Sequence, residues 1–211
     1  LKMGVHELGG SAPDCRFLLT NDPKAFRGAD KPAFVISSSQ VRDISGLMSE
    51  DGQLRWECPE GKWVVMRVGY TCTGAVVSTC SKGWDGLVLD YMDPEAFDFY
   101  VSEVVQPILD DAAHHVGRTL KYMETDSWEC GGMNWSKGFE EYFRNYMGYD
   151  LLPYLPVAAG FVVDDISTSN AFLADFRKTI ADAVANNHYR RFADFAHRNG
   201  MAILPESAGP H

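Results

Sequence analysis

Three acidic residues close together in the chain, Glu124, Asp126 and Glu129, have the types and spacing that suit chemistry. Carboxylates this close repel one another unless a cation, a proton or solvent relieves the charge. A shared site raises the pKa of at least one carboxyl group, which is what a general acid requires. The same oxygens are the ligands that a hard cation prefers. A solvated acidic loop is the alternative interpretation, and the residue types alone leave it open.

Two more acids, Glu206 and Asp90, come where apolar runs of the sequence end. Glycoside hydrolysis usually needs two carboxyl groups that flank the scissile bond, and Glu206 could face the first acids across the mouth of a barrel. An acid that caps the following loop is the alternative for Glu206. Asp93 and Pro94 form an ordinary helix start, so only Asp90 is interpreted as a candidate site residue in its segment.

Two tryptophans, Trp128 and Trp135, bracket residues 130–134 beside the acids. Flat sugar faces pack on indole rings, and Asn134 could form hydrogen bonds with sugar hydroxyl groups. We therefore interpret Trp128, Asn134 and Trp135 as candidate substrate-binding residues. The alternative is that both tryptophans belong to the hydrophobic core.

The elements that must position these residues follow a repeating order of strand, acid and helix. We predict strands at 86–90, 119–123 and 201–204. Helices are predicted at 94–114, at 137–147 and from a capping segment at 167–170 to Gly200. Pro153 and Pro156 predict an extended linker. Alternating strands and helices are typical of a parallel sheet with helical crossovers. In a (β/α) barrel, functional groups lie on the loops after the strands' C-terminal ends, which is where these acids fall.

The predicted fold is therefore α/β, a (β/α)8 TIM-barrel catalytic domain present here as a partial barrel. An open doubly wound sheet is the alternative, although no glycine-rich phosphate loop follows any strand. Residues 1–62 are predicted to be an irregular, short-strand segment inserted near the N-terminus, with a candidate strand at 34–38. The barrel segment is placed at 63–211. Its first strand is predicted at 63–70, where an apolar composition suits burial on both faces.

Composition argues against several classes of protein. The net charge is −10 and Lys and Arg do not cluster, which disfavours a nucleic-acid partner. No apolar run approaches the ~20 residues of a membrane-spanning helix. The five cysteines fit neither a zinc site nor a disulfide framework. The motifs of the common serine hydrolases, zincins and P-loop enzymes do not occur. Both ends look cut, which predicts further domains of a longer chain.

Several segments together carry a resemblance to a known family. They are 63–74 (WVVMRVGYTCTG), 126–129 (DSWE) with Asn134-Trp135, 148–150 (GYD) with 154–156 (YLP), and 175–179 (DFRKT). In combination they resemble glycoside hydrolase family 106, the α-L-rhamnosidases. The resemblance implies a (β/α)8 catalytic barrel in a longer multidomain protein, hydrolysis of terminal α-L-rhamnosides with inversion, and calcium in the active site. It also favours a periplasmic or extracellular location.

The resemblance further implies roles for single residues. Glu129 resembles the family's general acid. Asp126 and Glu206 fall where acids that contact the metal or the sugar are expected. Apart from the resemblance, we also predict that Asp90 and Arg67 bind substrate. The general base is expected on a later strand, beyond residue 211. Glu206 as the second catalytic carboxylate is the alternative that stays open.

Three rival functions also stay open. The first is a glycosidase that acts on another sugar. The second is a non-catalytic carbohydrate-binding protein on a barrel scaffold, in which the tryptophans carry the affinity. The third is a metal-dependent isomerase or lyase that uses the same acids.

Overall fold

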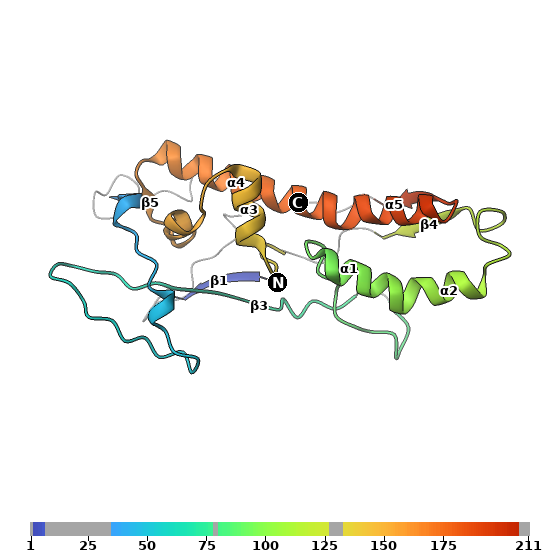
Figure 1. Ribbon diagram of the computed structural model, residues 1–211, viewed down its shortest axis with the longest axis horizontal. Helices are drawn as coiled ribbons and strands as arrows, with labels where there is room; N and C mark the ends of the chain where they lie inside the picture. Colours follow the sequence, from blue (N-terminus) through green and yellow to red (C-terminus); the bar gives the residue numbers. More distant parts are fainter. Residues whose placement is uncertain (1, 7–34, 78–79, 127–132, 207–211) are drawn as a thin grey trace. The chain divides into compact units, whose positions relative to one another are not determined.

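The computed structural model describes residues 2–6, 35–77, 80–126 and 133–206 (Figure 1). The chain divides into two compact units, each assembled from stretches far apart in the sequence. As far as these stretches are described, unit 1 consists chiefly of 70–139 and 178–211, and unit 2 of 3–69 and 140–177. The predicted division of the chain at residue 62 stays a prediction.

Unit 1 contains a pair of parallel strands, β4 (Tyr122–Thr125) and β6 (Ala202–Pro205). Their register pairs Thr125 with Pro205, so the two strands end at the same edge. The predicted strands at 119–123 and 201–204 are confirmed, although β4 begins later than expected. Their parallel pairing is also confirmed, and it brings together the chain segments that follow them.

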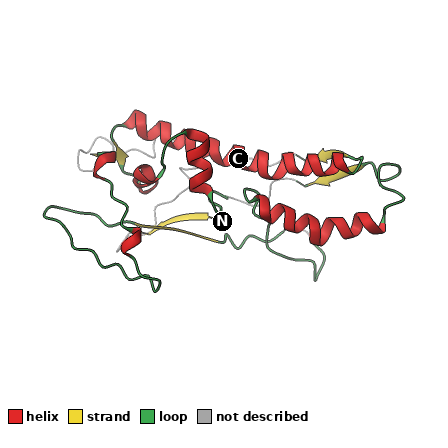
Figure 2. Ribbon diagram, viewed as in Figure 1, coloured by secondary structure: helices red, strands yellow, loops and turns green. Residues whose placement is uncertain are grey.

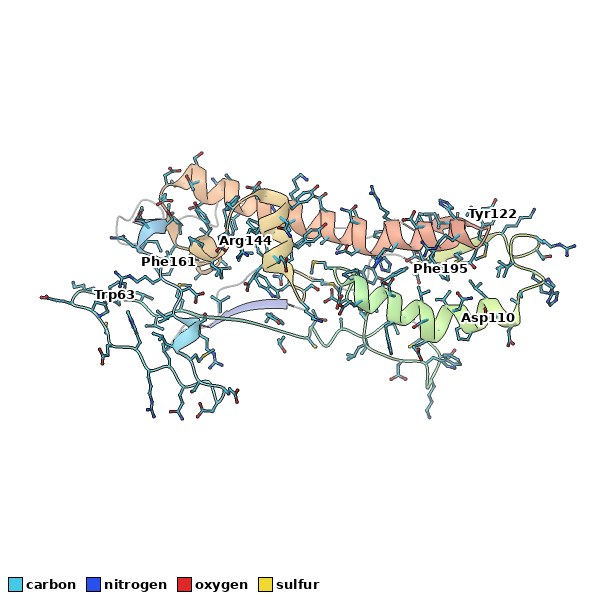
Figure 3. All side chains as sticks on the ribbon, viewed as in Figure 1. Trp63, Asp110, Tyr122, Arg144, Phe161 and Phe195 are labelled. Atoms are coloured by element: carbon cyan, nitrogen blue, oxygen red, sulfur yellow. The ribbon has the colours of Figure 1, made fainter. Side chains whose placement is uncertain are left out.

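Helices cover one face of this strand pair. From α2 (Gln106–Asp111) and α5 (Arg191–Arg198), Leu109 and Phe195 enter a buried cluster, against which Met123 of β4 packs. Figure 1 shows α2 running alongside α5, and Figure 3 shows Phe195 on the side of α5 that faces α2. Burying such a side chain stabilises the fold by roughly 1.5–3 kcal/mol, so this cluster holds the helices against the strands.

The helix that precedes β4 is built from α1 (Pro94–Tyr100), a π-helical turn η6 (Val101–Val105) and α2. The carboxylate of Asp93 accepts a hydrogen bond from the backbone N–H of Glu95 at 2.9 Å, and Pro94 opens the helix without an N–H to satisfy. The predicted helix start is therefore confirmed. The helix ends at Asp111, earlier than the predicted residue 114.

A long helix runs from α4 (Ile166–Val184) through the π-helical turn η8 (Ala185–Arg190) to α5. This confirms the helix predicted to end before Gly200. Its cap differs from the prediction, because the carboxylate of Asp165 accepts a hydrogen bond from the backbone N–H of Thr168 at 2.7 Å. Asp165 thus satisfies one of the N–H groups that every helix start leaves unpaired.

Unit 2 is organised around a shorter parallel pair, β2 (Val35–Ile36) and β5 (Val162–Val163). The hydroxyl group of buried Ser169 accepts from the N–H of Val163 at 2.9 Å and donates to its carbonyl oxygen at 3.1 Å. These two hydrogen bonds hold the start of α4 against β5. Beside them, α3 (Phe139–Met147) and α4 contribute an aromatic core. Its members are Phe143, Phe172 and Phe176.

The segment around Pro153 and Pro156 is a 3-10 helix, η7 (Leu152–Ala159), so the predicted extended linker is wrong. Proline is tolerated in the first turn of a helix, where its missing N–H is not needed. Leu155 and Val157 within the segment are buried. The burial of these apolar side chains, which the two prolines obscured, favours a compact turn over an extended chain.

The predicted first strand of the barrel segment, 63–70, is also corrected by the structure. Only β3 (Arg67–Thr71) is a strand, and it pairs with β1 (Lys2–His6). Val64 is 72% exposed, so burial on both faces is wrong. An apolar, β-branched run becomes a buried strand only where partner strands cover it, and within the described residues 63–66 have none.

The strand predicted at 86–90 is reduced to a single antiparallel bridge between Leu87 and Val76. Two backbone hydrogen bonds flank this bridge, from Val77 to Gly86 and from Val88 to Ala75. Figure 2 shows this part of unit 1 as loop. The predicted order of strand, acid and helix therefore holds for β4, and β6 shows the strand and the acid. At 86–90 the acid and the helix are present without the strand.

The described strands form three two-stranded sheets, β1–β3, β2–β5 and β4–β6. Helices mix with parallel strand pairs, as the α/β prediction required. A closed or partial barrel is not evident in the described part of the chain, so the TIM barrel stays a prediction. None of the helices in the described ranges is long and apolar enough to cross a membrane.

Candidate active site

Two of the predicted acids meet at the C-terminal ends of the parallel strands in unit 1. Asp126 follows Thr125, the last residue of β4, and Glu206 follows Pro205, the last residue of β6. The backbone N–H of Glu206 donates to the carbonyl oxygen of Thr125 at 2.9 Å. The hydrogen-bond ladder therefore continues past the strands and places Asp126 and Glu206 side by side.

The two carboxylates lie on the face of the strand pair that the helices leave open. Met123 and Ile203 pack against the helical cluster, and side chains alternate between the two faces of a strand. Continued by one residue, this alternation puts Glu124, Asp126 and Glu206 on the opposite face. All three residues are exposed. A run of acids on one open face at one strand edge is an arrangement that can bind a polar ligand.

A metal would need more ligands than this edge supplies. Carboxylate oxygens have the right chemistry for calcium, which takes six to eight oxygen ligands. In the described ranges, however, no three His, Cys, Asp or Glu side chains come close enough together to hold a metal ion. Asp126 and Glu206 thus fit calcium in type and fall short in number, so a calcium site at this edge would need further oxygen ligands.

Asp90 lies in the turn that leads into α1, and both oxygens of its carboxylate accept hydrogen bonds. Oδ1 accepts from the backbone N–H of Met92 at 3.0 Å, and Oδ2 accepts from the hydroxyl group of Ser136 at 2.9 Å. The side chain is half-buried and is fixed in orientation by these bonds. Ser136 belongs to the segment that follows β4, so this bond links the turn of Asp90 to the strand-end loop.

Asn134 and Trp135 are buried in the same segment, with 1% and 5% of their surface exposed. The ring of Trp135 stacks on Tyr70 with 6.0 Å between ring centroids and packs on Phe139 at 5.0 Å. Trp135 is therefore a core residue in this arrangement, as the alternative interpretation expected of it, whereas Trp128 lies outside the described residues. Contact of Asn134 and Trp135 with a sugar stays a prediction.

Of the three remaining predicted site residues, Arg67, Trp128 and Glu129, the structure describes Arg67. Arg67 belongs to unit 2, where its guanidinium group lies beside the turn at Gly52. Glu129 and Trp128 fall outside the described residues. Glu129 follows Asp126 by three positions in the sequence, so it belongs to the chain segment that leaves the end of β4.

The structure adds two residues that the sequence did not single out, Asn187 and His188 of η8. The side-chain N–H of Asn187 donates to the carbonyl oxygen of Met92 at 2.8 Å. The imidazole of His188 stacks on Tyr91 with 3.8 Å between ring centroids, and burial lowers its pKa to about 4. Apolar helix periodicity alone could not reveal them, because it does not show which loop a helix face contacts.

The fold and the site together define a class. Parallel strands that end in carboxylates, with helices packed on one face, are the arrangement of α/β enzymes that bind ligands at strand ends. The chain belongs to glycoside hydrolase family 106, described as alpha-L-rhamnosidase, whose model matches residues 14–211. The family predicted from the sequence is thereby confirmed.

Two relatives support this membership. The rhamnosidase from Novosphingobium sp. PP1Y is 33% identical and superposes with a TM-score of 0.74, over 81% of this chain and 17% of that chain. A protein of Formosa agariphila named "Putative beta-glucuronidase" is 38% identical over 172 residues, which are 82% of this chain and 15% of that protein. The chain therefore spans about a sixth of the length of these relatives.

Proposed function

We propose that the protein containing this chain is a glycoside hydrolase that releases terminal α-L-rhamnose from polysaccharides or glycosides with inversion of configuration. The observation that carries the proposal is the register of β4 and β6, which sets Asp126 beside Glu206 at one edge in a chain of family 106. The location that we propose for such an enzyme is the periplasm or the outside of the cell.

In the proposed reaction Glu129 protonates the glycosidic oxygen as it leaves. Its place in the sequence, three residues after Asp126, supports this role, because functional groups of a (β/α) barrel follow the C-terminal ends of its strands. A second carboxylate activates water on the opposite face of the sugar, and this group is Glu206 or an acid beyond residue 211. An inverting enzyme separates the two carboxyl groups by ~6.5–9.5 Å, which leaves room for the water.

The proposal also includes five substrate-binding residues. They are Asp90, Arg67, Trp128, Asn134 and Trp135. Of these, Asp90 has the strongest geometric support, because its carboxylate is held in place by Met92 and Ser136. A fixed carboxylate accepts hydrogen bonds from sugar hydroxyl groups without first losing conformational freedom.

We also propose that the strand pair belongs to a barrel completed by other parts of the protein. On the face away from the helices, Tyr122 is 59% exposed and Leu204 is 57% exposed. Figure 3 labels Tyr122 at this strand pair. Exposed apolar residues on an open sheet favour association, so a cover is expected. Further strands would turn this face into a barrel interior with the acids at its mouth.

Calcium is the proposed cofactor, with Asp126 and Glu206 as two of its ligands. A bound calcium ion would supply positive charge and a template for sugar hydroxyl groups. The support for this proposal is the type of the two carboxylates and their placement side by side. The protein's own residues perform the proton transfers in every step described above.

Another sugar is the second candidate substrate, since one relative is named as a beta-glucuronidase. A panel of 4-nitrophenyl glycosides, offered to the full-length protein, separates the candidates. We expect the α-L-rhamnoside to be cleaved with the highest kcat/KM. Release of glucuronate with no release of rhamnose would contradict the proposal.

The anomer released first, followed by proton NMR, tests the stereochemistry. Inversion predicts β-L-rhamnose as the initial product. An isomerase or lyase would release no free sugar by hydrolysis. With a non-catalytic binding protein, no product signals would appear in the spectrum. Initial release of α-L-rhamnose would contradict the inverting mechanism.

A further inference from the structure

The turn at 90–93 is held by hydrogen bonds within the turn and by one hydrogen bond from Ser136 outside it. The N–H of Asp93 donates to the carbonyl oxygen of Asp90 at 3.2 Å, and the N–H of Met92 donates to the Asp90 carboxylate. Ser136 holds the other carboxylate oxygen. These bonds fix the carboxylate relative to the turn, but the turn itself needs support from the body of unit 1.

That support comes from two adjacent residues of η8. Asn187 donates to the carbonyl oxygen of Met92 at 2.8 Å, and the ring of His188 lies on the ring of Tyr91, with only 3° between their planes. Neighbouring residues of an α-helix point about 100° apart, so they rarely contact the same turn. Here both contacts come from a π-helical turn, and such turns are frequent at functional sites.

The contact of His188 is made by the flat face of its ring. The residue is 7% exposed, and the rings of Phe97 and Tyr189 lie nearly perpendicular to the imidazole at ring-centroid distances of 5.6 Å and 5.1 Å. Neither ring nitrogen has a hydrogen-bond partner within the described part of the chain. The ring therefore supports Tyr91 through stacking, and a nitrogen in the ring is not needed for that contact.

We propose that η8 positions Asp90 for sugar binding, with Asn187 tethering the turn at Met92 and His188 supporting it at Tyr91. The inference rests on the proposed function, because it takes Asp90 to be a sugar ligand. Asn187 and His188 are positioning residues, since they act through the turn and not on the sugar. Their loss lets the Asp90 carboxylate move away from the orientation that binds substrate.

The test uses the full-length protein with the variants Asn187→Ala, His188→Leu and His188→Phe. Arg190→Ala is the matched control, because Arg190 is exposed on the same turn of helix. Hydrogen exchange of the peptide that contains 90–93 is measured together with kcat and KM for 4-nitrophenyl α-L-rhamnoside. Losing a hydrogen bond or a stacked ring should raise KM by roughly tenfold, with kcat changed less than about twofold.

The variants separate positioning from a merely structural role. Asn187→Ala and His188→Leu are expected to speed exchange at 90–93 and to raise KM, whereas His188→Phe, which keeps a flat ring, restores both to near the wild-type values. Unchanged exchange, or an unchanged KM despite faster exchange, overturns the inference. A third outcome is that the variants exchange faster at 90–93 while the wild-type protein cleaves no rhamnoside. This outcome contradicts the proposed function, and with it the role of Asp90 as a rhamnose ligand.

Discussion

At the scale of single residues, the burial of His188 makes the stability of the fold depend on pH. Burial lowers the pKa of His188 to about 4 from an ordinary value of 6.5. Between these two pH values the imidazole of His188 is protonated in the unfolded chain and neutral in the folded chain. The free energy of unfolding therefore falls as the pH drops through this range. The free energy of unfolding is unaffected by this group above its ordinary pKa of 6.5. Below a pH of about 4 the loss in the free energy of unfolding reaches at most about 3 kcal/mol.

Replacing His188 by Phe should remove this pH dependence. The phenyl ring keeps the stacking on Tyr91 and cannot be protonated. We expect the melting temperature of the full-length wild type to fall more steeply than that of His188→Phe between about pH 7 and about pH 5. Calorimetry at several pH values makes the comparison, and other titrating groups cancel because both proteins share them. Parallel curves for the two proteins would show that His188 does not titrate as described.

The residues of the candidate site could be predicted from the sequence only in part. Asp126 and Glu206 were found because an acid directly after an apolar strand is visible in the sequence, and the register then joins them. The burial of Trp135 was not decidable, since an indole ring suits a core and a sugar equally well. Ser136 was missed as the partner of Asp90, because a contact across 46 positions leaves no local pattern.

At the scale of elements, Ser169 holds the first turn of α4 to β5. Its buried hydroxyl group bonds both the N–H and the carbonyl oxygen of Val163. Removing the hydroxyl group leaves the buried N–H of Val163 without this partner, whereas its carbonyl oxygen still accepts from the N–H of Asp165 at 2.8 Å. A buried unsatisfied group costs about 1–3 kcal/mol. The local stability of the β2–β5 pair therefore depends on one side chain.

Ser169→Ala is expected to speed hydrogen exchange at Val163 by about tenfold, which corresponds to roughly 1.4 kcal/mol. Mass spectrometry of peptides from the full-length protein measures the exchange. Ser167→Ala is the control, because Ser167 is exposed at the start of the same helix. Equal exchange in the two variants would show that the Ser169 hydroxyl group does not stabilise β5.

Helices were predicted better than strands at this scale. The periodicity of apolar residues in α4 and α5 is a local property, so the long helix was visible in the sequence. A strand depends on partners elsewhere in the chain, and for this reason 63–66 and 86–90 looked like buried strands without forming them. The prolines of η7 favoured an extended chain locally, and burial of Leu155 and Val157 outweighed that preference.

At the scale of the whole molecule, calcium is expected to stabilise the protein by binding its folded form. A ligand at about a hundred times its dissociation constant adds about 2.7 kcal/mol to the free energy of unfolding. Removing calcium from the full-length protein with EGTA should lower the melting temperature and the activity, and added calcium should restore both. Magnesium should restore little, because it demands a tighter octahedral site.

Variants at the strand ends tie this effect to the site. Asp126→Asn and Glu206→Gln should reduce the rise in melting temperature that calcium produces, whereas Asp182→Asn, a control remote in sequence from both strand ends, should not. An unchanged melting temperature after chelation would contradict the calcium proposal. A calcium effect that survives both strand-end variants would place the ion elsewhere in the protein.

In the proposed mechanism Glu129, which follows β4 in the sequence, is the proton donor for glycoside hydrolysis. The most direct test compares Glu129→Gln with wild type in the full-length enzyme, using an alkyl α-L-rhamnoside and a 2,4-dinitrophenyl α-L-rhamnoside. A poor leaving group needs protonation and a good one does not. We predict that kcat/KM for the alkyl rhamnoside falls by roughly a hundred- to ten-thousandfold, with a much smaller loss for the dinitrophenyl substrate. Near-wild-type cleavage of the alkyl rhamnoside by Glu129→Gln would contradict the account.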